Sequence, residues 1–180
     1  GSHHSIYTRM PGISVVAPMT PCEYQAIWDY FMAHTDPMCV SEHRKSFAID
    51  YEMPDSIHST ADITLFPISS TRLNALEAQK MLAAEGITAN IVHLVWLRPF
   101  FADDRIKKTL ASSGSRGLVL DGDFPNGVVK QIAFDIMHTV QGARIDVLAL
   151  EDRVTGFAPH FDNVPPTAER IREKVKSMLI

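Results

Sequence analysis

The chain has 180 residues, and its 17 basic against 21 acidic side chains give a formal net charge of −4. Apolar residues make up 46% of the chain, a share that is usual for a buried core and argues against wholesale disorder. The negative balance argues against non-specific nucleic-acid binding, which needs a basic face. The length allows one ordinary domain, or one domain together with part of a neighbour.

The sequence also bears on the compartment. No apolar run approaches the ~20 residues of a membrane-spanning helix, and no signal peptide with a basic start and an apolar middle is present. Two cysteines, Cys22 and Cys39, are too few for a disulfide framework. We therefore expect a cytoplasmic protein without a nucleic-acid or membrane partner.

The first third of the chain predicts a strand, a helix and a second strand. Residues 13–17 are mostly β-branched and lie between proline breakers, which favours a short buried strand. Thr20 and Glu23 are typical of a capping box at a helix start, and the helix is expected to run to about residue 34. Residues 38–40 predict the second strand. One apolar stripe follows the helix at three- and four-residue spacing: Tyr24, Ile27, Trp28 and Phe31.

Residues 42–61 are rich in charged residues and predict a polar connecting segment. We therefore divide the chain into residues 1–45, which belong to one α/β domain, a linker over residues 46–60, and a second domain over residues 61–180.

After the linker, strands and helices alternate. Strands are expected at 63–68, 87–97, 117–121 and 144–150, and helices from Ser70 to Gly86, from Asp103 onward, over 127–140 and after Thr167. The alternation predicts a three-layer α/β fold with a mostly parallel sheet and helices on both faces.

Ligands of such sheets bind beyond the carboxyl ends of the strands, which places Gly122 and Asp123 at the expected edge. No glycine-rich phosphate loop is present there. Gly122 and Gly127 lie between a strand and a helix, but their spacing matches no dinucleotide or Walker pattern. We interpret this segment as a tight connection rather than a binding turn.

The residues alone reveal no self-contained catalytic set. Six scattered histidines have no helical metal-site spacing, so no metal site is expected: His34, His43, His58, His93, His138 and His160. His93 falls in a buried strand and is interpreted as a hydrogen-bonded structural residue. Cys22 and Cys39 are interpreted as structural too, and no Gly-x-Ser-x-Gly nucleophile elbow occurs.

Several short segments nevertheless resemble one enzyme family in the correct order. Residues 11–18 (PGISVVAP) resemble the segment that closes the pyrimidine-binding domain of transketolase-like thiamine-diphosphate enzymes. Residues 36–44 resemble a strand end in the beta subunit of 2-oxoacid dehydrogenases. Segments at 61–65, 75–87, 90–100, 118–121 and 166–171 resemble consecutive parts of the transketolase C-terminal domain.

This resemblance implies that residues 1–45 are the terminal fragment of a pyrimidine-binding domain and residues 61–180 a transketolase C-terminal domain. It implies thiamine diphosphate and Mg²⁺ for the complete enzyme. The chain lacks the Gly-Asp-Gly and Asn magnesium signature, so no cofactor is expected on it alone.

The implied function is assembly and interaction rather than catalysis. The implied partners are a homo-oligomer such as a dimer, a subunit carrying the diphosphate-binding domain, or an acyltransferase core. Two alternatives are a stand-alone small-molecule-binding regulatory domain and one half of a split enzyme that completes the active site of a partner. Both ketose phosphates and 2-oxoacids fit as substrates of the whole enzyme.

The start of the chain has two interpretations. Residues 2–6 resemble a histidine-containing segment that precedes the pyrimidine-domain motif in this family, which implies a catalytic role for His4 as a general acid/base or oxyanion partner. Residues 1–5 equally fit the remnant of an expression tag.

Overall fold

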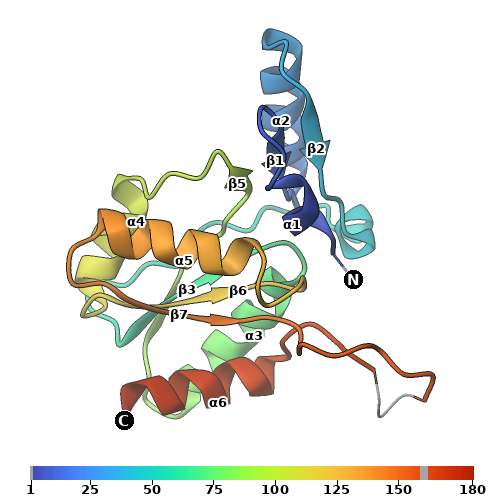
Figure 1. The fold of residues 1–180 in the computed structure, drawn as a ribbon. Helices are drawn as coiled ribbons and strands as arrows, with labels where there is room; N and C mark the ends of the chain where they lie inside the picture. Colours follow the sequence, from blue (N-terminus) through green and yellow to red (C-terminus); the bar gives the residue numbers. More distant parts are fainter. Residues whose placement is uncertain (1, 159–161) are drawn as a thin grey trace.

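The computed structural model describes residues 2–158 and 162–180, and within these ranges the strands form two sheets (Figure 1). The larger, called here the C-terminal sheet, has the order β4–β3–β6–β7, and all of its neighbouring strands are parallel. The smaller, the N-terminal sheet, has the order β2–β1–β5. The strands are β1 (Ser14–Val16), β2 (Met38–Val40), β3 (Ile63–Pro67), β4 (Ala89–Ile91), β5 (Trp96–Arg98), β6 (Arg116–Leu120) and β7 (Arg144–Leu148).

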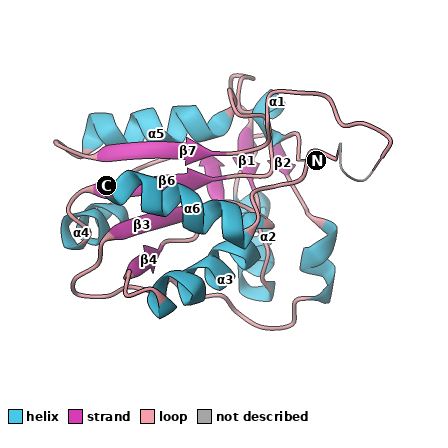
Figure 2. Ribbon diagram, turned by 90° about the horizontal axis from the view of Figure 1, so that it is seen from below, coloured by secondary structure: helices cyan, strands magenta, loops and turns pink. Residues whose placement is uncertain are grey.

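Helices cover both faces of the C-terminal sheet (Figures 1 and 2). The helices α4 (Asp104–Ser112) and α5 (Val128–Thr139) pack on one face, in a core cluster that includes Phe66 and Val119. The helices α3 (Thr71–Ala84) and α6 (Ala168–Leu179) pack on the other face with the neighbouring Leu65 and Leu118, because successive strand residues point to opposite faces. The predicted three-layer α/β fold is confirmed.

Local signals set the ends of these helices. The Asp103 carboxylate accepts the backbone N–H of Ile106 at 3.0 Å and caps α4, and Thr167 caps α6 through the N–H of Arg170. Gly86, with a φ of 78°, follows the end of α3 in a left-handed conformation that glycine adopts without strain. The predicted helix starts and stops therefore lie close to those of the structure.

The predicted single strand over 87–97 is wrong, because the chain changes sheet within it. β4 pairs in parallel with β3 in the C-terminal sheet, whereas β5 pairs antiparallel with β1 in the N-terminal sheet. Both halves of the segment are largely buried. A continuous apolar run marks burial and does not show which sheet each half joins.

The helix α2 (Pro21–Ala33) also differs from expectation. Of its predicted apolar stripe only Ile27 is buried, whereas Trp28 is 59% and Phe31 44% exposed, and the next residue, Met32, is 66% exposed. Their face of α2 has no covering element in the described part of the chain.

The predicted linker packs against the C-terminal sheet. A short 3₁₀ helix (Arg44–Ala48) overlaps its start, and Ser56 exchanges two backbone hydrogen bonds with Ile91 of β4, at 2.8 and 3.0 Å. The boundaries at 45 and 61 stay a prediction. Across the described residues, no helix has the length and apolar character needed to cross a bilayer.

Candidate functional site at the carboxyl end of β6

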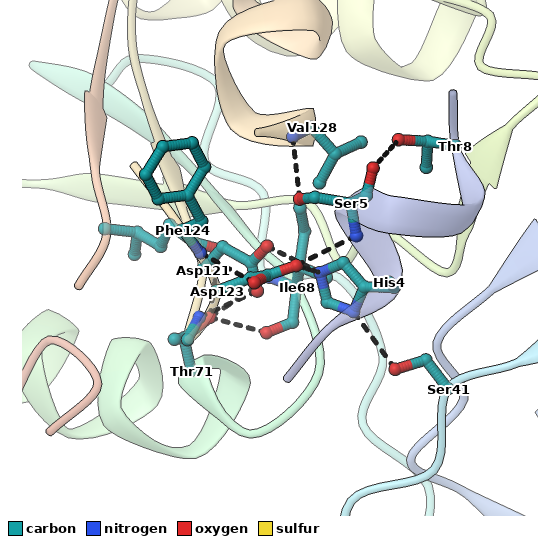
Figure 3. Close-up of polar contacts among 12 residues, drawn as sticks. His4, Ser5, Thr8, Ser41, Ile68, Thr71, Asp121, Asp123, Phe124 and Val128 are labelled. Atoms are coloured by element: carbon teal, nitrogen blue, oxygen red, sulfur yellow. Dashed lines mark hydrogen bonds and ion pairs between the residues drawn. The ribbon is translucent and has the colours of Figure 1, made fainter. Parts of the chain in front are cut away.

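The N-terminal segment of the chain occupies the edge where ligands of α/β sheets bind. His4 opens the short helix α1 (His4–Tyr7), and its imidazole is 1% exposed (Figure 3). His4 Nε2 lies 2.6 Å from Asp121 Oδ2, just past β6, and Nδ1 lies 3.0 Å from Ser41 Oγ, just past β2. The sequence identified this edge and, separately, His4, but the two residues are 117 positions apart and no local signal shows that they meet.

Ser5 makes the second anchor of this segment. Its backbone N–H donates to Asp123 Oδ2 at 2.9 Å, and its Oγ accepts the N–H of Val128 at 3.0 Å (Figure 3). The Val128 N–H is one of the free donors at the start of α5, so Ser5 caps that helix from a distance. A Cβ on Gly127 would overlap the Ser5 side chain. The connection between Gly122 and Gly127, interpreted from the sequence as structural, therefore also binds the N-terminal segment of the same chain through Ser5.

The pair of His4 and Asp121 is buried beside Asp123, and the pKa values of both members of the pair are raised. Burial alone lowers the pKa of His4, but the charge and hydrogen bond of Asp121, together with the charge of Asp123, raise it above its usual value. Burial raises the pKa of Asp121 against the opposing effect of His4. One backbone donor completes the hydrogen bonding of this pair, since the N–H of Gly122 donates to Asp121 Oδ1 at 2.7 Å.

The same three residues are the one group of possible metal ligands among the described residues, with ligand atoms within 4.8 Å of one another. The 2.6 Å separation of His4 Nε2 and Asp121 Oδ2 is that of a charge-assisted hydrogen bond. Two ligands each at about 2.1 Å from a shared metal lie farther apart than this in tetrahedral geometry. The present geometry therefore holds a proton between two residues.

Thiamine diphosphate, which the resemblance implies for the complete enzyme, does not fit these residues. Its diphosphate is anionic, whereas Asp121 and Asp123 are carboxylates that are buried and already bonded within the chain. Anion sites use backbone N–H groups and cationic side chains. The N–H donor at the start of α5 is taken by Ser5.

A partly buried ion pair joins α2, beside the N-terminal sheet, to α3, beside the C-terminal sheet. Arg72, on α3, is 0% exposed, and its Nη1 donates to Glu23 Oε2 on α2 at 2.7 Å. The same oxygen accepts the N–H groups of Met19 and Thr20 at 2.8 and 3.2 Å, as the glutamate of a capping box does. The sequence predicted the capping role of Glu23 but not its arginine partner, which lies 49 residues away.

The interpretation of His93 as a hydrogen-bonded residue holds for its backbone N–H, which donates to Asp55, but only weakly for its ring. The ring is buried, and apart from a weak interaction with the Pro54 backbone neither ring nitrogen has a hydrogen-bond partner of normal geometry among the described residues. Burial, reinforced by the charges of Arg72 and Arg105, lowers its pKa to about 3. Of the other candidates, His43 caps the 3₁₀ helix through the N–H of Lys45, and both cysteines are free thiols. Gly1 and His160 lie outside the described residues.

Comparison with known proteins agrees with this fold. The family model "Transketolase, C-terminal domain" matches residues 55–171, which is well over half of the chain. The chain therefore belongs to the transketolase C-terminal domain family, and the resemblance found in its sequence is confirmed.

Two curated relatives are similar to this chain in sequence. The chain is 28% identical over 177 residues to the acetoin:2,6-dichlorophenolindophenol oxidoreductase subunit beta of Cupriavidus necator, covering 91% of this chain and 50% of that one. It is 26% identical over 116 residues to the pyruvate dehydrogenase E1 component subunit beta of Mesostigma viride, covering 56% and 36%. The chain thus spans at most about half the length of these relatives.

Solved structures are similar in fold. A split-gene transketolase, described as an inactive beta4 tetramer, superposes with a TM-score of 0.76 at 17% identity, over 98% of this chain and 60% of that one. A transketolase from Pichia stipitis superposes with a TM-score of 0.69 at 16% identity, over 97% and 26%. At such identities the likeness establishes the fold.

Proposed function

We propose that this chain is the C-terminal assembly portion of a thiamine-diphosphate enzyme subunit, of the transketolase or 2-oxoacid dehydrogenase beta kind, and that it is not catalytic alone. One observation carries the proposal: a C-terminal sheet covered on both faces adjoins an N-terminal sheet whose edge strand and helix are open. Relatives named as beta subunits support the partnership.

The open surface has the chemistry of a subunit interface. We call it the α2 face, and it centres on Trp28, Phe31 and Met32 beside β2. A cavity of about 400 Å³ opens next to it. Apolar patches of this kind mark interaction sites, and an unpaired strand edge accepts a further strand. The proposed occupant is a subunit that carries the diphosphate-binding domain and the rest of the pyrimidine-binding domain; the other expected partners are a second copy of the chain and an acyltransferase core.

His4 is the proposed catalytic residue of the complete enzyme. The charges of Asp121 and Asp123 raise the pKa of His4, which favours the protonated form that a general acid needs. In this chain both ring nitrogens of His4 are hydrogen-bonded, to Asp121 and Ser41. We propose that docking of the partner subunit breaks one of these hydrogen bonds and exposes the imidazole. The proposed compartment is the cytoplasm.

The split-enzyme alternative has specific support. The solved structure described as a split-gene transketolase is covered to 60% by this chain, against 26% for the Pichia stipitis enzyme. A separate partner chain, rather than an upstream part of the same chain, would then complete the active site.

Calorimetry and sedimentation test the proposal. The chain alone should give no binding heat with thiamine diphosphate and Mg²⁺, and micromolar affinity would contradict the proposal. Sedimentation velocity should show self-association that rises with concentration and is lost in Trp28→Ser/Met32→Ser. Phe134→Ser, which removes an exposed aromatic from α5 away from this face, is the matched control. A strict monomer at high concentration would remove the homo-oligomer from the proposal.

A further inference from the structure

A separate cavity of about 770 Å³ lies between α2, the segment around β5 and the start of α4. It is distinct from the His4 cluster, since different residues form it. Its walls are largely aromatic and aliphatic, and they include Tyr30, Trp96, Phe100, Phe101 and Ile106. Tyr30 and Trp96 meet edge to face with ring centroids 4.7 Å apart. The volume falls within the range of ligand pockets for small organic molecules.

One polar ring in the wall lacks well-formed hydrogen bonds. His93 is 3% exposed, and although the Pro54 backbone acts on its pKa as a weak hydrogen-bond partner, neither ring nitrogen makes a hydrogen bond of normal geometry among the described residues. An unsatisfied buried polar group is costly to the fold, and such groups in native proteins call for an explanation. A neutral imidazole has one donor and one acceptor. His93 is one of the residues that line the cavity, so a ligand bound there lies beside its imidazole.

The charged side chains of the wall are already engaged. Asp55 accepts from Arg105 at 2.9 Å and from the backbone N–H of His93 at 2.8 Å. Asp103 caps α4, and Glu23 binds Arg72. A charged ligand would have to break these pairs, whereas a neutral ligand would leave them intact.

We propose that this cavity binds an uncharged aromatic molecule whose hydroxyl or ring N–H group hydrogen-bonds to His93. The aromatic walls supply apolar contact on the faces of such a molecule. His93 supplies the polar contact that fixes its orientation, as a few convergent polar groups do in small-molecule pockets. This site is independent of the proposed assembly function.

2-Naphthol is the probe, and its fluorescence follows the titration of the full chain. We expect saturable binding at one site. Removing the hydrogen bond between the ligand hydroxyl and His93 should weaken binding about tenfold. The loss should appear when 2-naphthol is titrated into His93→Leu, and also when 2-methylnaphthalene is titrated into the wild type. In histidine-labelled protein, the ring nitrogen signals of His93 should shift on binding.

Two further variants keep the test specific. Ala26→Trp, at an exposed α2 position that lines the cavity, should abolish binding by filling it, and because Ala26 is exposed the fold should tolerate the change. His138→Leu, on the exposed side of α5, is the matched control and should bind like the wild type. The proposal is overturned by the absence of saturable binding to the wild type, by equal affinity in folded His93→Leu, or by undiminished binding to Ala26→Trp.

Discussion

The two sheets of this molecule are built by the same sequence alternation, yet they differ in how fully they are covered. The central strands β3 and β6 of the C-terminal sheet are buried between two helical layers. In the N-terminal sheet, β2 is an edge and α2 buries one residue, Ile27. Since a helix is held mostly by packing of its apolar face, the comparison shows that one unit has its own core and the other depends on its neighbours.

Several contacts join the N-terminal sheet to the C-terminal one, and three of them span long stretches of sequence. The chain leaves the C-terminal sheet after β4 so that β5 pairs with β1, Glu23 binds Arg72, and His4 binds Asp121. Each joins residues far apart in sequence. The predictions below weaken first the core, then the contacts, and finally the wall of the cavity between the two units.

The largest expected effect is a difference in stability loss between a core substitution in the C-terminal sheet and a surface substitution on α2. Phe66→Ala should lower the free energy of unfolding by about 4 kcal/mol, because it leaves a void in a fully buried core. Phe31→Ala, on the exposed α2 face, should cost less than about 1 kcal/mol, since that ring is already half in water. Urea unfolding measures both. Equal losses would contradict the view that only the C-terminal sheet has a complete core.

Breaking the ion pair between α2 and α3 comes next. Glu23→Gln should cost about 2–3 kcal/mol, because Arg72 would remain a buried charge without the carboxylate that is hydrogen-bonded to it. Glu77→Gln is the matched control, since its pair with Lys80 is exposed and should change stability by less than about 0.5 kcal/mol. If the two variants unfold at the same urea concentration, the pair does not hold the units together.

The third contact predicts a pH dependence. The pKa of His4 is raised in the folded state, so its contribution is fully present below the unfolded value of 6.5 and is lost as pH rises through the folded pKa. The raised pKa of Asp121 acts in the same direction. The stability difference between the wild type and His4→Gln should shrink by up to about 1.4 kcal/mol per pH unit across this window. A difference that stays constant from about pH 6 to about pH 9 would show that His4 is not the proton-binding group.

The sequence predicted what local patterns determine. Asp103, Thr167 and Gly86 act through neighbours within a few residues, and the helix ends followed from them. The alternation of strands and helices predicted the parallel sheet. Short family-like segments in the correct order predicted the family, which the family match confirms.

What the sequence missed depends on contacts between distant segments. The crossing at residues 92–95, the burial of His4 against Asp121 and the arginine partner of Glu23 are set by how the two sheets dock. A hydrophobic period marks which residues avoid water, but it does not say which element covers them, so the exposure of Trp28 could not be predicted.

The smallest expected effect concerns the cavity between the two units. His93→Leu should raise the free energy of unfolding by about 1 kcal/mol at neutral pH, because it replaces a buried imidazole that lacks well-formed hydrogen bonds by an apolar side chain. The gain should grow on acidification. In the wild type the pKa of His93 falls from 6.5 to about 3 on folding, so below 6.5 the unfolded chain takes up a proton that the folded chain does not, and stability declines toward pH 3. His138→Leu, exposed on α5, should show neither change in thermal and urea unfolding. A stability loss in His93→Leu would mean that the imidazole is already hydrogen-bonded in the free protein. Its nitrogens would then not be available to a ligand.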